Sequence, residues 1–128
     1  MKALLDTHAF LWFIEGARPL GKAAVDVLQD ERNEVLLSQA SVWEMAIKHS
    51  MGRLPLNLPF DVFATSQLEA NAFALLGIRV EHLFVIAGLP FHHSDPFDRL
   101  LVAQSRVEGV PIAGSDRALD AYGVQRIW

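Results

Sequence analysis

The sequence predicts an α/β protein in which helices cover both faces of a mostly parallel sheet of about five strands. Short apolar segments alternate along the chain with longer segments of helical periodicity, which is the pattern of strand–helix–strand units. The apolar segments are nearly continuous, as expected for strands that are covered on both faces. Because 128 residues suit one compact unit with one core, we expect a single domain over residues 1–128.

In the first half of the chain, glycines mark the helix ends. Gly16 and Gly52 follow apolar positions at helical spacing, and glycine often ends a helix because it adopts the left-handed conformation easily. The expected order is a strand at 3–6, a helix at 7–16, a helix at 20–31, a strand at 34–38, a helix at 38–52 and a helix that follows Pro59.

In the second half, prolines separate the elements. Pro90 ends one predicted helix and Pro96 begins the next, since proline lacks the N–H that an interior helical position donates. The expected order is a strand at 73–78, a helix at 79–89, a helix from 96 to about 108, a strand at 110–114, a helical turn at 115–123 and a strand at 124–128.

The composition excludes several classes of protein. With 52% hydrophobic and 20% charged residues, the chain is not a disordered polymer, and some of its apolar surface suits a partner chain. The absence of cysteine excludes disulfides and thiolate zinc sites, and it fits a cytoplasmic protein. The longest apolar run, LFVIAGLPF, is too short to span a membrane. No phosphate-binding glycine loop or nucleophilic-serine motif occurs.

Acidic residues follow or lie near the ends of several predicted strands. Asp6 and Asp116 each follow a strand, so both are expected at the edge of the parallel sheet where ligands bind. Asp98 and Glu44 lie in helices that can reach the same edge. The net charge of −4 disfavours nucleic acid as a partner. That objection weakens if the acids converge on a divalent cation, which reverses the local field.

Some of these acids also have a purely structural interpretation. Asp95 suits the N-cap of the helix that begins at Pro96, and Asp98 would meet the free amides of its first turn. Asp116 is likewise an ordinary N-cap candidate. For these residues helix capping and metal binding both remain open.

Capping explains two other acids less well. Ser38 can start the helix that contains Glu44, which leaves Glu44 beyond the first turn, although it can pair with Lys48 four residues later. Asp6 closes a buried apolar strand, where a carboxylate is costly unless it is paired, hydrogen-bonded or bound to a cation.

The histidines are weaker candidates for metal ligands than the acids. His92 and His93 precede a helix in a loop, where polar residues are usually solvated, and we expect solvation rather than metal ligation. No paired-histidine spacing typical of zinc enzymes occurs, so zinc is not expected.

Four segments, taken in order, resemble a PIN-domain ribonuclease of the VapC toxin type. They are LLDTHAFLW, SVWEMAIK, HHSDPFDRLLVAQS and IAGSDRALDAYGV, and the resemblance covers nearly the whole chain. It implies a three-layer α/β/α sandwich with an acidic pocket that binds Mg²⁺ or Mn²⁺ and hydrolyses RNA phosphodiester bonds.

The resemblance also implies roles for individual residues. The catalytic and metal-binding acids would be Asp6, Glu44, Asp98 and Asp116. We expect Asp6 and Asp98 to hold the principal ion, and the other two to hold a second ion or to position water. Supporting residues would be Ser115, Thr7 and Asp95, and the RNA-binding rim would comprise Arg99, Arg117 and Lys48, with Arg53 nearby.

The resemblance also implies partner proteins, and two alternative functions stay open. The VapC type implies a cognate antitoxin protein that blocks the site, and the apolar composition is compatible with that contact and with a homodimer. One alternative is a non-catalytic PIN-like module that binds RNA or protein. Another is a metal-dependent DNA nuclease or phosphatase, because a fold does not determine a substrate.

Overall fold

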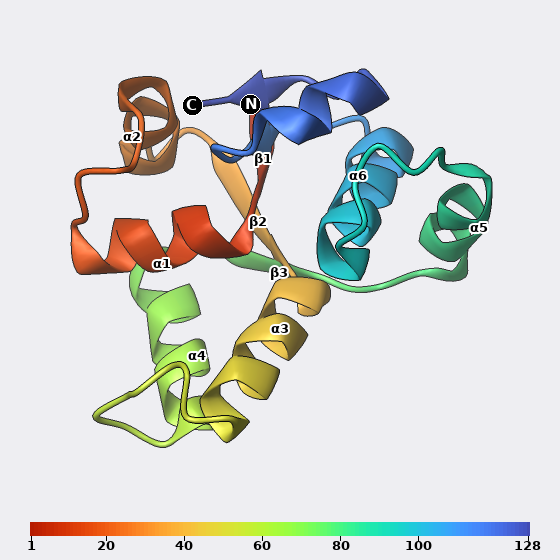
Figure 1. Ribbon diagram of the computed structural model, residues 1–128. Helices are drawn as coiled ribbons and strands as arrows, with labels where there is room; N and C mark the ends of the chain where they lie inside the picture. The colour runs from red at the N-terminus through yellow and green to blue at the C-terminus, as the bar shows by residue number, and fades with distance from the viewer.

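A parallel sheet lies at the centre of the computed structural model, which describes residues 1–128 (Figure 1). The order of the strands in the sheet is β3-β2-β1-β4-β5, and every neighbouring pair is parallel. The strands are β1 (Lys2–Leu5), β2 (Glu34–Ser38), β3 (Ala74–Leu76), β4 (Ile112–Ala113) and β5 (Arg126–Ile127). The α/β class and the parallel sheet predicted from the sequence are therefore confirmed.

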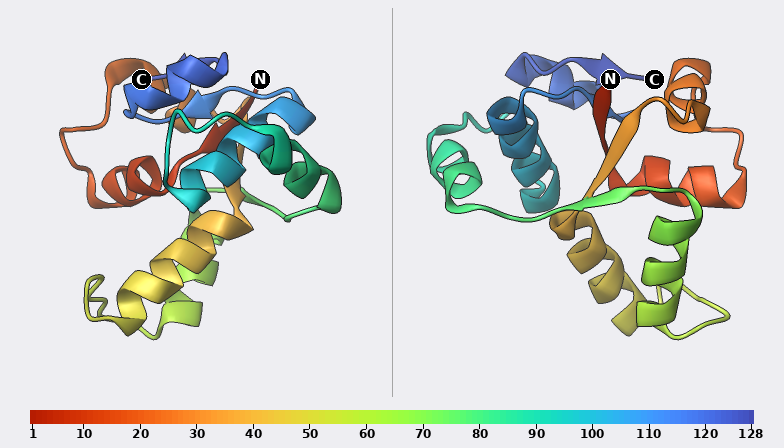
Figure 2. Two further views of the ribbon diagram at one scale, coloured as in Figure 1. Left: turned by 45° about the vertical axis from the view of Figure 1, so that its right-hand side comes forward. Right: turned by 180° about the vertical axis from the view of Figure 1, so that it is seen from behind.

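Helices lie on both sides of this sheet. In Figures 1 and 2, α1 and α2 lie on one side and α5 and α6 on the other, while α3 and α4 extend together beyond one end. The helices are α1 (Thr7–Glu15), α2 (Lys22–Gln29), α3 (Gln39–Ser50), α4 (Phe60–Ala70), α5 (Val80–Gly88), α6 (Pro96–Glu108) and the 3₁₀ helix η1 (Arg117–Tyr122). None of them combines the length and the apolar character that a membrane crossing requires.

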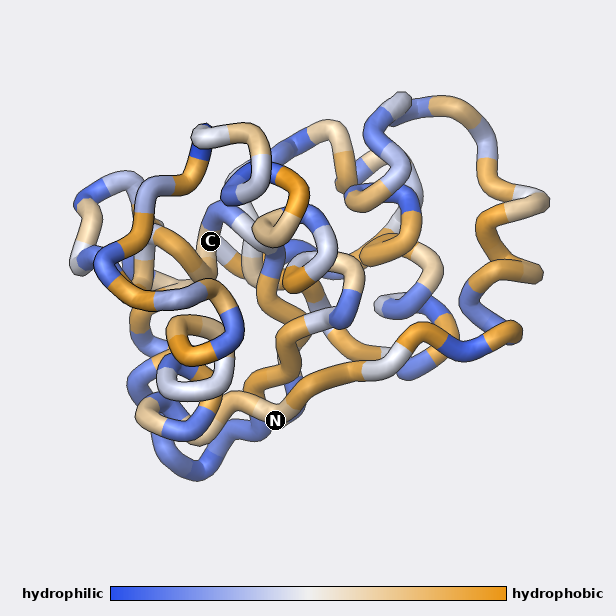
Figure 3. Tube along the Cα trace, turned by 90° about the horizontal axis from the view of Figure 1, so that it is seen from below, coloured by the Kyte–Doolittle hydropathy of each residue, from blue (hydrophilic) through white to orange (hydrophobic).

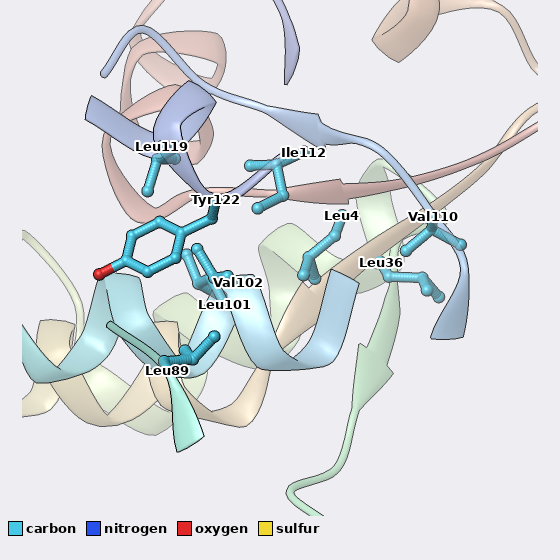
Figure 4. Close-up of a cluster of buried hydrophobic side chains, with 9 residues drawn as sticks. All are labelled: Leu4, Leu36, Leu89, Leu101, Val102, Val110, Ile112, Leu119 and Tyr122. Atoms are coloured by element: carbon cyan, nitrogen blue, oxygen red, sulfur yellow. The ribbon is translucent and has the colours of Figure 1, made fainter. Parts of the chain in front are cut away.

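Successive residues of the central strands point into two separate apolar layers. Leu4 packs with Leu101 and Tyr122 in one buried cluster, whereas Leu5 packs with Phe10 and other residues in a second cluster. Figure 4 shows the first cluster, where the Tyr122 ring packs inward and its hydroxyl points away from the aliphatic side chains. This alternation follows from the two-residue period of a strand and explains why β1 is apolar throughout.

The helix boundaries follow the sequence signals. Gly16 and Gly109 have φ angles of 67° and 66° and end α1 and α6 in the left-handed conformation. Ser38 caps α3 by accepting a hydrogen bond from the Ala40 amide, which leaves Glu44 beyond the first turn as predicted.

The strand β4 is shorter than the predicted segment 110–114. The amide of Val110 donates to the Ser105 carbonyl at the end of α6, and Pro111 has no amide hydrogen to donate. Only Ile112 and Ala113 are therefore assigned to the strand, although the Pro111 carbonyl still accepts from Leu4.

Candidate metal centre

Asp6 lies at the carboxyl end of β1, between the sheet and α1. Its amide donates to the Ala113 carbonyl over 3.0 Å, which extends the β1–β4 pairing by one residue. Its carboxylate caps α1 by accepting from the Ala9 amide over 2.7 Å. Asp6 is only 6% exposed, and Gly114 lies so close that an added Cβ would collide with the Asp6 carboxylate. Asp6 is thus fixed in a buried position at the edge of the sheet.

Asp98 reaches this edge from the first turn of α6. Asp95 is the N-cap of that helix, and its Oδ1 accepts from the amides of Phe97 at 2.8 Å and Asp98 at 3.3 Å. Pro96 occupies the first turn. The Asp95 carboxylate therefore has the capping geometry expected from the sequence, while the Asp98 side chain, 26% exposed, faces His93.

Asp116 follows β4 and caps η1. Its Oδ1 accepts from the Ala118 amide over 2.9 Å, so its second oxygen is available for another contact. That contact is with Nε2 of His93, at 2.7 Å from Oδ2 of Asp116. The same nitrogen lies 3.2 Å from Oδ2 of Asp98. His93, Asp98 and Asp116 offer ligand atoms that all lie within 4.8 Å of one another.

Glu44 approaches from α3. Its side chain is 12% exposed and lies 3.1 Å from the Lys48 ammonium, one turn further along the helix. This is the ion pair that the sequence spacing allowed, and both side chains are largely buried, with Lys48 33% exposed.

The pKa shifts show that the acids share one electrostatic environment. Burial raises the pKa of Asp98 to about 7, and the charge of Asp95 adds to the increase. His93 opposes the increase, and Asp6 and Glu44 add smaller upward contributions. The pKa of Asp6 is also raised, first by burial and then by Glu44 and Asp116, although its hydrogen bond from Ala9 lowers it. Carboxylates that raise one another's pKa in this way leave negative charge for a cation to neutralise.

Asp116 has the opposite shift. Desolvation acts to raise its pKa, but the hydrogen bonds from Ala118 and His93 together outweigh that effect, so the net pKa is lowered. Asp116 is therefore held as a carboxylate, whereas Asp98 retains a proton more easily.

A model of the PIN domain family matches residues 3–125, nearly the whole chain. The chain belongs to the PIN domain family. Asp6, Glu44, Asp98 and Asp116 all lie within the part of the chain that the family model covers.

The chain is also similar to two individual proteins. Ribonuclease VapC16 of Mycobacterium tuberculosis (strain ATCC 25618 / H37Rv) is 55% identical over 29 residues, which are 23% of this chain and 21% of that protein. The chain thus matches about a fifth of that relative's length. The crystal structure of VapBC2 from Rickettsia felis, bound to a DNA fragment from their promoter, has a TM-score of 0.65 at 14% identity and matches 98% of this chain and 97% of that chain. This second likeness shows a shared fold.

The structure corrects one residue of the predicted rim of this PIN domain. Arg99 is only 6% exposed, and its guanidinium donates to the carbonyls of Pro90 and Leu89 and to the Tyr122 hydroxyl. Its role is to join α6 to the end of α5 and to η1, so it is not a surface contact for phosphate. The local sequence places Arg99 next to an acidic residue, but it does not determine whether the side chain points into the protein or towards solvent.

The other supporting residues lie near the acids. Arg117 and Ser115 are exposed on either side of Asp116, and Thr7 is buried beside Asp6. Lys48 contacts Glu44 as described. Their proposed roles stay predictions.

His93 is the residue that sequence reasoning undervalued. We expected a solvated loop histidine, but its side chain is 17% exposed and touches two of the predicted ligands. The available signal was its place directly before the SDPFD segment that starts α6, because a loop that delivers Asp95 also brings its neighbours to the pocket.

Proposed function

We propose that this PIN domain is a metal-dependent endoribonuclease that acts as the toxin of a toxin–antitoxin pair. The observation that carries the proposal is the grouping of acids at one edge of the sheet: the ligand atoms of Asp98, Asp116 and His93 lie within 4.8 Å of one another, and Asp6 is buried at the end of β1. The raised pKa of Asp98, about 7, agrees with this crowding, since burial and then the charge of Asp95 raise it. Crowded, partly buried carboxylates are unfavourable without a cation, and they cluster at functional sites. Membership of the PIN family and the partial match to a VapC ribonuclease support hydrolysis of RNA.

The donor set fits a hard divalent ion. Asp6, Glu44, Asp98 and Asp116 offer carboxylate oxygens, which are the ligands that Mg²⁺ and Mn²⁺ accept. The ion, when bound, would supply Lewis-acid activation of a water and neutralise charge on the phosphate oxygens. We assign Asp6 and Asp98 to the principal ion, with Asp116 and Glu44 holding a second ion or orienting water.

Surrounding residues would prepare the pocket for this chemistry. The cap that Asp6 forms on α1 and the close approach of Gly114 fix one carboxylate with little freedom, and the N-cap at Asp95 fixes the helix that carries Asp98. Groups held in this way need little reorganisation when substrate binds. Arg117, exposed beside Asp116, is the remaining candidate for contact with the RNA backbone.

The proposed antitoxin partner has a suitable surface. A cavity of about 280 Å³ is lined by Leu11 and Ile14 of α1, by residues 54–58 and by Phe63 of α4, and it is mainly apolar. Such a groove fits an apolar protein segment better than a nucleic acid. The structural relative from Rickettsia felis is itself one component of VapBC2, which supports the same kind of partner here.

We also propose a homodimer, with the cytoplasm as the place of action. Val80, Leu83 and Phe84 of α5 are 49–70% exposed, and Figure 3 shows this helix as an outlying segment rich in hydrophobic residues. Exposed apolar side chains grouped in this way are typical of protein contacts. Sedimentation of the wild type and of a Leu83→Glu, Phe84→Glu variant tests the dimer, which should dissociate in the variant.

A comparison of substrates tests the proposed reaction. Labelled single-stranded RNA, DNA of the same sequence and p-nitrophenyl phosphate are each incubated with the protein and Mg²⁺, Mn²⁺ or EDTA. We expect internal cuts in RNA that require metal and no turnover of the other two substrates. Cutting of DNA would favour a DNA nuclease, release of nitrophenol a phosphatase, and binding of RNA without cutting a non-catalytic module.

A further inference from the structure

His93 lies between two acids that come from different elements. Its Nε2 is 2.7 Å from Oδ2 of Asp116 in the turn after β4 and 3.2 Å from Oδ2 of Asp98 in α6. The side chain is 17% exposed, so water competes only weakly for these contacts. This geometry suits two roles, which are a further metal ligand and a hydrogen-bond donor that holds the carboxylates.

The other ring nitrogen distinguishes between them. Nδ1 of His93 accepts a hydrogen bond from the Asp95 amide over 3.0 Å. A backbone amide is always a donor, so Nδ1 carries no hydrogen. The neutral ring then carries its hydrogen on Nε2, and that hydrogen points to Asp116. A histidine that binds metal through Nε2 needs the reverse tautomer, which would direct two hydrogens at each other between Nδ1 and the Asp95 amide.

The backbone of the loop is also held in place. The His93 amide donates to the Tyr122 hydroxyl over 3.0 Å, and that hydroxyl donates to the Pro90 carbonyl over 2.8 Å. Arg99 donates to the same hydroxyl and to the same carbonyl. Because Tyr122 and Arg99 are 3% and 6% exposed, the loop is anchored on buried groups and the ring has little freedom to turn.

We propose that His93 is a positioning residue of the metal centre: its Nε2–H donates to Asp116 and draws Asp98 towards it, and it does not bind the ion. The inference rests on the proposed function, since it assumes that Asp98 and Asp116 are ligands. Groups that hydrogen-bond to ligands orient them, and their loss typically lowers metal affinity by about 10-fold to 100-fold.

Two substitutions separate the two hydrogen bonds of the ring. The amide nitrogen of His93→Gln can take the place of Nε2 as a donor to Asp116, whereas the amide oxygen of His93→Asn can take the place of Nδ1 as an acceptor from Asp95. If His93 positions the acids, His93→Gln should keep Mn²⁺ affinity within about threefold of the wild type, and His93→Asn should lose about tenfold or more. If His93 only shapes the loop, His93→Asn should be the better replacement. Asp26→Asn, at an exposed acid on α2, is the control.

Spectroscopy tests the role of His93 without a measurement of activity. Nitrogen NMR of the metal-free wild type should show His93 with its hydrogen on Nε2, and pulsed EPR of the Mn²⁺ complex should show no histidine nitrogen coupled to the ion. The opposite tautomer, or a nitrogen coupling that His93→Gln removes, would overturn the inference while leaving the nuclease proposal intact. A protein that binds no Mn²⁺ would contradict the proposed function, and the tautomer of the metal-free protein would still decide whether His93 donates to Asp116.

Discussion

Gly114 packs directly against the Asp6 carboxylate across the ends of β4 and β1. No side chain fits at this position, since a Cβ would collide with the carboxylate, and Asp6 has no room to retreat because it is buried and caps α1. A residue without chemistry of its own therefore determines where a predicted metal ligand lies.

Replacement of Gly114 by alanine should damage the pocket more than the fold. The added methyl group must displace the Asp6 carboxylate or the turn before Asp116, and overpacking of this kind costs about 1–3 kcal/mol. We expect Mn²⁺ affinity to fall about tenfold or more, because either displacement moves a predicted ligand. Calorimetric titration measures this, with Gly88→Ala as the control, since nothing lies within 4 Å of the Cβ position there. Unchanged affinity in Gly114→Ala would mean that the position of Asp6 is unimportant.

The raised pKa of Asp98 predicts a pH-dependent stability of the metal-free protein. Its pKa is about 7 in the folded protein, compared with 3.8 for an isolated aspartate side chain. Between these values the folded state binds a proton that the unfolded state has lost, so stability falls as pH rises through this window and is lowest above about pH 7. Asp98→Asn, which is never charged, should gain stability relative to the wild type by a few kcal/mol at most on going from about pH 4 to about pH 8. Urea unfolding of both proteins checks the sign. If the stability of Asp98→Asn relative to the wild type rose towards acid pH, the prediction would be contradicted.

Divalent metal should stabilise the folded protein. A ligand that binds only the folded state adds about 2.7 kcal/mol at 100 times its dissociation constant. We expect the melting temperature to rise with Mg²⁺ or Mn²⁺ concentration and to return to its starting value with EDTA. Asp6→Asn should reduce the rise, whereas Asp26→Asn, at an exposed acid on α2, should leave it unchanged. A melting temperature indifferent to metal would count against the pocket.

Arg99 should prove to be a structural residue. Arg99→Ala would remove the guanidinium that donates to the Leu89 carbonyl and would leave the Pro90 carbonyl with only the Tyr122 hydroxyl as donor, at a cost of about 2–4 kcal/mol. Arg117→Ala, which removes an exposed cation, should change stability by less than about 0.5 kcal/mol and weaken RNA binding instead. Denaturant unfolding and RNA binding, measured on both variants, separate the two roles. Equal stability of the two variants would contradict the assignment.

Much of the fold was predictable because local signals and the tertiary structure agree. Gly16, Ser38 and Pro96 mark helix boundaries through their own backbone or capping preferences, and these do not depend on distant residues. The start of β4 was less predictable, since Val110 could belong to the strand by composition but its amide donates to the Ser105 carbonyl in α6.

The candidate site was also predictable only in part. Asp6 was predictable because a carboxylate at the end of a buried strand needs an explanation, and the Asp95 cap followed from the proline after it. The position of His93 depends on the Tyr122 hydroxyl, 29 residues further along the chain, and on an internal arginine. The SDPFD segment indicates only that His93 lies near the pocket. The direction of its ring and of the Arg99 side chain depends on these distant contacts, so the histidine was expected in solvent and the arginine on the surface.

If the acids form one metal pocket that cuts RNA, a change in one of them should remove Mn²⁺ binding and cleavage together. The most direct measurement is single-turnover cleavage of labelled RNA by the wild type, Asp98→Asn and the control Asp26→Asn, with Mn²⁺ binding measured on the same preparations. We predict cuts that require metal in the wild type and in Asp26→Asn, with loss of both cleavage and Mn²⁺ affinity in Asp98→Asn. Cleavage by a folded Asp98→Asn at the rate of the wild type would contradict the central claim.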